Sequence, residues 1–424
     1  MTKEISYKST VYACYLGNIT MATVVNLLPV LFIPLREQYG FSYSQLGALV
    51  LINFVTQVTF DIIFSFLVDK YGFRRFIVAS PVLTLLGMGL FACAPWLTEN
   101  PYPLFIVGTI IYSGSCGLLE LLLSPIVNAI PTDEKASAMS VLHAFYCWGQ
   151  ILVVALSTLF LHLFGRDSWQ ILMLLWLLVP LADFFLFIKV PLAPPVPEEL
   201  RQGIRQIKGK GLLAMFFCAI ALGGASELAM SQWSSAFAEK ALGVTKVVGD
   251  LSGMCIFALF MGLVRTLHGA KKSRLSLKRI PLQKLLPLGF AFSVVCYLVA
   301  ALSPNSTVGL IACALTGAGV ALLWPGTLSA AAERFPLAGA WMFAILAAGG
   351  DLGCSVGPWL VGKLADAAQL SAPLQEYALQ KQLSPDELGL KFGLLFSTVF
   401  PLLGLALTLV LRRNRAGERG ADAL

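Results

Sequence analysis

Long apolar runs recur along the whole length of the chain, and they constrain its fold more than any other feature of the sequence. A run of 18 or more apolar residues forms a helix long enough to cross the hydrocarbon core of a bilayer, which is about 30 Å thick. Only 12% of the residues are charged, whereas a soluble domain carries about 25%. The sequence therefore predicts an all-α membrane protein with twelve transmembrane helices, at residues 10–34, 44–68, 75–95, 103–129, 137–163, 168–189, 211–237, 247–268, 283–302, 305–331, 337–363 and 390–411.

Basic residues are distributed unevenly between the connections that join these spans. If the N-terminus is cytoplasmic, the cytoplasmic segments hold 23 of the 30 Lys and Arg residues, as the positive-inside rule requires. We therefore expect both termini in the cytoplasm and a multi-pass protein of the cytoplasmic (inner) membrane, because helical spans do not form outer-membrane barrels. The long outer connection at 365–389 is expected to contain a short surface helix, for which the sequence suggests no function.

The second half of the sequence repeats features of the first at an offset of 200 residues. The matching pairs are Gly117 and Gly317, Pro125 and Pro325, Ala144 and Ala344, and Gly149 and Gly349. Parallel six-helix repeats are typical of transporters that work by alternating access. We therefore predict two pseudo-symmetric six-helix bundles at 1–190 and 211–411, a Pro-rich and basic cytoplasmic linker at 191–210, and a cytoplasmic tail at 412–424.

The connection after the second span, residues 65–75, reads SFLVDKYGFRR. This stretch resembles the Gly-x-Leu-x-Asp-Arg-x-Gly-Arg-Arg signature of the major facilitator superfamily. Together with the twelve spans and the repeat, the resemblance implies the major facilitator fold. A carboxylate at the end of one helix can pair with cations or with a helix N-terminus of the other bundle. We therefore expect Asp69, Gly72 and Arg74 to contribute to a cytoplasmic gate, with simple topogenic charge as the alternative.

Polar residues recur every four positions along the second span, at Asn53, Gln57, Asp61, Ser65 and Asp69. Side chains four residues apart share one face of a helix, and a polar face is not expected to contact lipid. We predict that this face lines the central cavity or the seam with the other bundle. On this interpretation Gln57 contacts substrate and Asp61 belongs to the cytoplasmic gate. Hydrogen bonding between helices is the alternative for Asn53 and Gln57.

Glu120 lies among leucines in the fourth span, in the stretch CGLLELLLSP at 116–125. A charged side chain at the bilayer centre costs roughly 2.5–3.5 kcal/mol on insertion scales, and desolvation favours the neutral form of a carboxyl group. A group that takes up and releases a proton as its access to water changes is what a proton-coupled carrier needs. We therefore interpret Glu120 as a proton-coupling residue, with a permanently protonated structural group as the alternative.

Two further acidic residues of the predicted spans are candidates for proton coupling. Glu227 of the seventh span is a second candidate for proton coupling, and a structural or gating role is the alternative. Asp351 of the eleventh span follows closely spaced glycines and is a third candidate, which could instead pair across the seam between the bundles.

Several of these residues sharpen the resemblance within the superfamily. Gly117 and Glu120 with Pro125 look like the fourth span of the fucose–galactose–glucose:proton symporter family, and Phe145 with Gly149 looks like its fifth. Glu227 stands six residues before Trp233, as in that family's seventh span, and Asn26 lies where the family places polar substrate and proton residues. The resemblance implies a sugar as substrate and a proton as coupling ion. The sequence departs from the family in having Ser124 before Pro125 and no acidic residue between 9 and 34, which weakens the case for a sugar more than the case for a proton.

The candidates for substrate binding are polar or aromatic residues of the spans. Indole faces stack on the C–H surface of sugars and amides hydrogen-bond to hydroxyl groups. The candidates are Asn26, Gln57, His143, Tyr146, Trp148, Gln150 and Trp233, with ordinary packing as the alternative for each of them.

The sequence thus predicts a transporter of a small polar solute, for which a sugar is one candidate. Its transport is expected to be coupled to a proton, with sodium as the alternative coupling ion. Efflux of amphipathic compounds is the second hypothesis, and a membrane-embedded sensor or enzyme is the third. We find no catalytic motif, metal-ligand cluster or phosphate loop in the sequence. We expect no enzymatic activity, no cofactor, no metal and no nucleic-acid partner. The expected partners are the lipid bilayer, the solute and a proton, and the expected state is a monomer.

Overall fold

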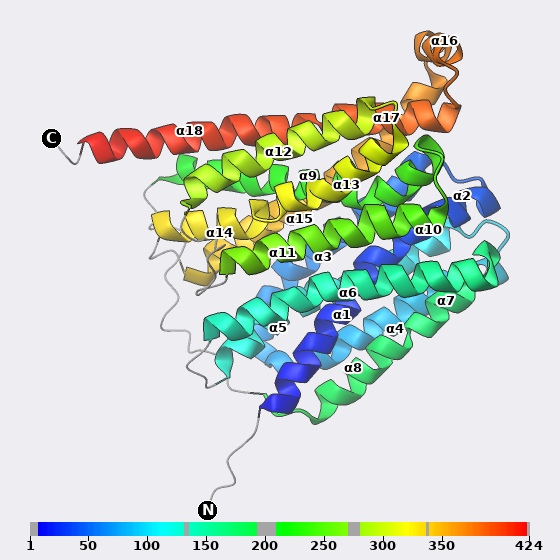
Figure 1. Ribbon diagram of the computed structural model, residues 1–424. Helices are drawn as coiled ribbons and strands as arrows, with labels where there is room; N and C mark the ends of the chain where they lie inside the picture. The colour runs from blue at the N-terminus through cyan, green and yellow to red at the C-terminus, as the bar shows by residue number, and fades with distance from the viewer. Residues whose placement is uncertain (1–6, 131–134, 193–208, 270–279, 336–338, 422–424) are drawn as a thin grey trace, which may run out of the picture. The chain divides into compact units, whose positions relative to one another are not determined.

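The computed structural model describes residues 7–130, 135–192, 209–269, 280–335 and 339–421, and these residues form helices and no strand. Twelve helical segments within them are long and apolar enough to cross a membrane. The predicted all-α architecture with twelve spans is thereby confirmed (Figure 1).

The helices of the first half are α1 (Lys8–Val30), α2 (Phe32–Tyr39), α3 (Tyr43–Tyr71), α4 (Phe73–Leu97), α5 (Tyr102–Ala129), α6 (Lys135–Phe164), α7 (Trp169–Trp176) and α8 (Leu178–Lys189). Those of the second half are α9 (Lys210–Ala241), α10 (Lys246–Gly249), α11 (Ile256–Gly269), α12 (Leu282–Leu302), α13 (Ser306–Val320), α14 (Leu323–Arg334), α15 (Gly339–Leu370), α16 (Ala372–Lys381), α17 (Pro385–Ser397) and α18 (Val399–Ala421). A 3-10 turn, Arg166–Ser168, precedes α7, and a π-helical turn, Asp250–Cys255, joins α10 to α11.

The chain divides into two compact units. Unit 1 comprises Met1–Phe41 and Ile52–Glu198, and unit 2 comprises Ser42–Leu51 and Glu199–Leu424. In unit 1, α1 packs against α6 and α4 packs against α5, and in unit 2, α9 packs against α15 and α12 against α18 (Figure 1). The bounds predicted for the two bundles stay a prediction, because most of the predicted linker at 191–210 lies outside the described residues.

The first turns of α3 belong to unit 2 because their contacts lie there. Asp366 Oδ1 accepts the backbone N–H of Tyr43 at 3.1 Å, and its Oδ2 accepts that of Ser44 at 2.7 Å. These N–H groups lack partners inside their own helix, and a carboxylate at a helix N-terminus stabilises them. The buried Tyr43 ring also makes an edge contact with Trp233, at 5.5 Å between centroids.

Four of the predicted spans contain an interruption with one physical cause. Proline has no N–H group, so the carbonyl four residues earlier loses its helical hydrogen bond. Each interruption lies within two residues of a carbonyl group that has lost its N–H donor to a proline. Each of these prolines lies in the first turn of the following helix, where a missing N–H group is tolerated. The interruptions separate α1 from α2, α7 from α8, α13 from α14 and α17 from α18, and the prolines are Pro34, Pro180, Pro325 and Pro401.

The internal repeat appears as the same helix contact in both units. A β-carbon on Gly117 of α5 would lie 2.8 Å from the backbone oxygen of Gln57 in α3. A β-carbon on Gly317 of α13 would lie 2.1 Å from the backbone oxygen of Phe257 in α11. Gly317 lies 200 positions after Gly117 in the sequence, and Phe257 lies 200 positions after Gln57. The two contacts therefore support the pseudo-symmetry inferred from the sequence.

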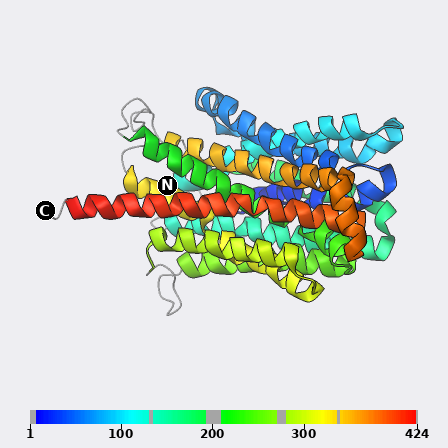
Figure 2. The same cartoon turned by 90° about the horizontal axis from the view of Figure 1, so that it is seen from above.

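The predicted surface helix in 365–389 is confirmed as α16, which runs across the ends of α15 and α17 (Figure 2). Ala378 of α16 packs with Ala368 of α15 and Leu388 of α17, and the partly buried Leu374 covers this small cluster. The packing fixes α16 to unit 2.

Arg74, one of the predicted gating residues, contacts the C-terminal end of α8. Its guanidinium donates to the carbonyl oxygens of Phe187 at 3.1 Å, Ile188 at 3.0 Å and Val190 at 2.6 Å. The last carbonyls of a helix lack intrahelical donors, and a cation there is favourable. Within unit 1, Arg74 therefore joins the start of α4 to the end of α8.

Replacing Arg74 by glutamine is expected to lower the thermal stability of the purified protein. Hydrogen bonds to a charged group contribute about 1.5–3 kcal/mol, and the exposure of Arg74 places the loss near the lower bound. Differential scanning fluorimetry of Arg74→Gln beside Arg412→Gln, which removes the same charge from an exposed position on α18, separates the capping contact from the charge. Equal melting temperatures in the two variants would contradict the capping role.

Candidate functional site

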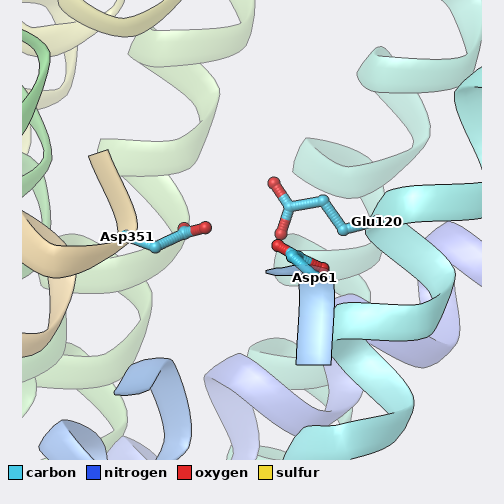
Figure 3. A group of neighbouring side chains, drawn as sticks. All are labelled: Asp61, Glu120 and Asp351. Carbon is cyan, nitrogen blue, oxygen red and sulfur yellow. The ribbon is translucent and has the colours of Figure 1, made fainter. Parts of the chain in front are cut away.

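Two carboxyl side chains of unit 1 face each other between α3 and α5. The carboxylate oxygens of Asp61 and Glu120 lie within 4.8 Å of each other, and Figure 3 shows the two groups side by side. Both residues are partly exposed. Among the described residues, no Lys, Arg or His side chain forms an ion pair with either carboxylate. The structure therefore brings two acidic groups together without a compensating cation in the part of the chain that it describes.

A close approach of α5 to α3 positions this pair. A β-carbon on Gly117 would lie 2.8 Å from the Gln57 backbone oxygen and 3.2 Å from Asp61 Oδ1. Small residues permit such backbone contacts between membrane helices. Toward the other end of the contact, Ser113 donates to Asn53 Oδ1 at 2.6 Å. The polar face predicted for α3 is thus turned toward α5 at all three of its described positions.

The polar candidates of unit 1 include three buried amides. Asn26, Gln57 and Gln150 each expose 2% of their surface. Asn26 Nδ2 donates to the Tyr146 hydroxyl at 3.4 Å, which joins α1 to α6. The side-chain nitrogens of Gln57 and Gln150 have no hydrogen-bond partner among the described residues. A buried donor without a partner is costly, so these two groups are suited to a polar ligand.

Two other sequence candidates lie on the surface of unit 1. Trp148 exposes 59% of its area, and His143 is also exposed. The Nε2 atom of His143 lies 3.5 Å from the Ser124 hydroxyl, so α6 meets α5 at this point. The structure does not bring Trp148 or His143 into the interior with the buried amides.

Glu227 of α9 forms an ion pair with Arg265 of α11, at 3.5 Å between Oε2 and the terminal nitrogen. Their side chains expose 14% and 28% of their area, respectively. Arg265 Nε also donates to the carbonyl of Ala321 at 3.0 Å. This is the carbonyl that loses its helical donor to Pro325. The break between α13 and α14 therefore supplies the acceptor that orients Arg265 toward Glu227.

A double-mutant cycle on this ion pair is expected to show coupling. Arg265→Gln removes the cation beside a largely buried carboxylate and leaves that carboxylate unpaired. The double variant Glu227→Gln/Arg265→Gln is therefore expected to lose less stability than the sum of the losses in the two single variants. We expect a coupling energy of about 1–2 kcal/mol, against about 0.2–1 kcal/mol for an exposed pair. Arg166 and Glu37, an exposed pair at 2.7 Å, provide the control. Equal coupling in both pairs, measured by thermal unfolding, would contradict the role of burial.

The remaining candidates of unit 2 are buried within it. Trp233 is fully buried and its indole N–H donates to the Pro358 carbonyl at 2.8 Å. Asp351 of α15 exposes 3% of its surface, and it follows Gly350, which packs closely on Gly224 of α9. Trp233 therefore packs within unit 2 and exposes no ring face.

The other predicted gating residues lie at the junction of α3 and α4. Gly72 alone connects these helices, with φ +82° and ψ 154°, a conformation that disfavours any residue with a β-carbon. The side chain of Asp69 lies outside the described part of the chain. Asp61, also predicted as a gating residue, lies beside Glu120.

Two buried acidic groups were not identified from the sequence. Asp250 is fully buried, accepts a hydrogen bond from Ser235, and pairs with Lys246 at 3.1 Å in the π-helical turn. The four-residue spacing of Lys246 and Asp250 was a usable signal for this pair. Asp183 of α8 is also fully buried and accepts from Thr20 at 3.2 Å, and an acidic residue in an apolar span was its only signal.

A comparison with protein families matches residues 13–358 to the Major Facilitator Superfamily. Membrane protein MosC of Rhizobium meliloti is 22% identical over 381 residues, which cover 88% of this chain and 86% of MosC. These matches extend through both units.

Solved structures of transporters share the fold. A bacterial homolog of the human lysosomal transporter Spinster, in an inward-facing and occupied conformation, has a TM-score of 0.73 at 13% identity and covers 96% of this chain and 97% of its own. A D-xylose-proton symporter has a TM-score of 0.72 at 16% identity, with 93% and 97% covered. The Escherichia coli fucose:proton symporter FucP has a TM-score of 0.60 at 15% identity, with 97% and 99% covered. At these identities the likeness concerns the fold.

Proposed function

Because the chain belongs to the Major Facilitator Superfamily, we propose that it is a secondary active transporter that moves a small polar solute with a proton by alternating access. The fold and the family are those of transporters. The solute, the coupling ion and the direction of transport are the parts of this proposal that experiments must test.

The observation that carries the proposal is the Asp61–Glu120 pair. Two carboxylates within 4.8 Å of each other, without a cation among the described residues, repel each other in a medium of low dielectric constant. One proton on the pair removes this repulsion and allows a hydrogen bond between the two groups. The pair is partly exposed, so it can exchange the proton with water. We propose that loading and release of this proton drive the conformational cycle.

The chemistry of the buried amides supports a polar and uncharged solute. The donors of Gln57 and Gln150 that lack partners match the hydroxyl or carbonyl oxygens of such a compound. Asn26 and Tyr146, joined at 3.4 Å, can donate and accept in the same way. A sugar meets these requirements, and the xylose and fucose symporters with the same fold transport sugars with protons.

We propose separate roles for the remaining candidates. Glu227 is held in an ion pair by Arg265, so its contribution to coupling requires that pair to open during the cycle. Asp351 is a second proton site in unit 2. Asp69, Gly72 and Arg74 act at the cytoplasmic end, with Gly72 and Arg74 fixing the junction of α3, α4 and α8. Both termini lie in the cytoplasm, and the protein works as a monomer in the inner membrane.

Transport assays in proteoliposomes test this proposal. Radiolabelled hexoses, pentoses and nucleosides are offered with a pH gradient, a sodium gradient or neither, and both inward and outward movement are measured. We expect accumulation of one of these solutes only when the compartment from which it is taken is more acidic. Accumulation driven by sodium alone would replace the proton as coupling ion, and outward transport of amphipathic compounds only would favour efflux.

A further inference from the structure

An apolar groove of about 850 Å³ lies on unit 1 between α3, α4 and α5. Its volume is within the range of about 300–1,000 Å³ that is usual for small-molecule sites. Phe60, Phe64 and Leu67 line it from α3, Val82 from α4, and Leu118 from α5. The groove is separate from the Asp61–Glu120 pair, because neither residue lines it. It is formed in part by the same helices, since Phe60 is the neighbour of Asp61 in α3 and Leu118 lies two residues before Glu120 in α5.

The groove has the length of one lipid acyl chain. The lining residues of α3 extend from Phe60 to Tyr71, which corresponds to about 16 Å of helix at 1.5 Å per residue. One leaflet of the hydrocarbon core is about 15 Å thick. Phe64 and Phe76 both line the groove, and their rings meet edge to face with centroids 5.5 Å apart. An apolar chain rather than a polar solute is therefore the matching occupant.

One end of the groove is basic. Arg75 of α4 lines it beside Tyr71, with the guanidinium carbon 5.9 Å from the Tyr71 ring centroid. Arg75 is exposed and lies in the first turn of α4, where the helix end also favours negative charge. The positive-inside rule assigns this end to the cytoplasmic surface, where anionic lipid head groups gather.

We propose that this groove binds an anionic phospholipid of the cytoplasmic leaflet. One acyl chain lies along α3 from Phe60 toward Tyr71, and the phosphate of the head group pairs with Arg75. Tyr71 lies at the level of the glycerol backbone, where amphipathic aromatic side chains are favoured. The bound lipid packs against the side of α3 next to Asp61 and so supports the helix that carries this residue. The binding site does not depend on which solute or ion is transported.

Native mass spectrometry of the delipidated full-length protein tests the head-group contact. The protein in neutral detergent is offered equal amounts of palmitoyl-oleoyl phosphatidylglycerol and the corresponding phosphatidylcholine. One basic residue near the surface is expected to favour the anionic lipid about fivefold. Arg75→Gln reduces the ratio to about one, whereas Arg412→Gln, with the same change of charge on α18, leaves it near the wild-type value. Equal ratios in these two variants would overturn the proposal.

A second pair of variants tests the groove. Val82 lines the groove and Leu86, one turn further along α4, is 59% exposed and does not line it. Val82→Trp is expected to reduce the binding of both lipids several-fold, and Leu86→Trp to leave it unchanged. Glycerol 1-phosphate, offered as the free head group, is expected not to compete. Competition by glycerol 1-phosphate, or equal binding by the two tryptophan variants, would contradict a lipid site.

Discussion

Glutamine in place of Glu120 is expected to abolish proton-driven accumulation of solute while leaving exchange of solute across the membrane. Glutamine keeps the size of the side chain and its capacity for hydrogen bonding, but it cannot take up and release a proton. With glutamine at position 120, no second carboxylate repels that of Asp61. The pair therefore no longer needs a bound proton to remove the repulsion. We expect accumulation under a pH gradient to fall to the level without a gradient, as measured in proteoliposomes.

Two controls accompany this measurement. Glu99→Gln makes the same chemical change at an exposed position between α4 and α5 and is expected to accumulate solute like the wild type. Counterflow by Glu120→Gln shows that the variant still binds and moves solute. Concentrative uptake by Glu120→Gln equal to that of Glu99→Gln would remove Glu120 from the coupling role.

Alanine in place of Gly117 is expected to uncouple transport through the position of Asp61. The added β-carbon would lie 2.8 Å from the Gln57 backbone oxygen and 3.2 Å from Asp61 Oδ1, so α3 and α5 must move apart. Overpacking of this kind costs about 1–3 kcal/mol. We expect a lower melting temperature and a loss of proton-driven accumulation, measured together on one preparation.

The internal repeat provides the matched control for Gly117. Gly317→Ala introduces the same kind of contact in unit 2, with the β-carbon 2.1 Å from the Phe257 backbone oxygen. We expect this variant to be destabilised at least as much as Gly117→Ala. Among the proteins that remain folded, however, its ratio of accumulation to exchange should stay closer to wild type. An equal loss of coupling in both variants would show that helix packing in general, and not the position of Asp61, explains the effect.

The fold could be predicted from the sequence because it follows from local patterns. Apolar runs of sufficient length specify spans whatever their neighbours are, and the repeated Gly117 and Gly317 indicate the same contact twice. Prolines did not mark the interruptions by themselves, because Pro81, Pro125 and Pro287 lie inside continuous helices. The predicted spans 10–34 and 305–331 therefore cross the breaks between α1 and α2 and between α13 and α14, because hydropathy alone does not register a lost hydrogen bond.

The pairing of charged residues could not be predicted in the same way. Glu120 has no other charged residue near it in the sequence and therefore appeared isolated. In the structure, a second acidic residue, Asp61, lies beside it on another helix. Likewise, Glu227 and Arg265 lie on different helices, 38 positions apart in the sequence, and only the structure pairs them. Such pairs depend on the rotation and depth of whole helices, which hydropathy and spacing within one helix do not determine.

Infrared titration of the purified protein tests the shared proton most directly, because it requires no knowledge of the solute. Difference spectra of the carboxyl C=O stretch are recorded between acidic and alkaline pH for the wild type and for Asp61→Asn/Glu120→Gln. The Asp61–Glu120 account predicts a protonated carboxyl band that disappears as pH rises in the wild type and is missing from the double variant. Identical difference spectra for the two proteins would contradict it.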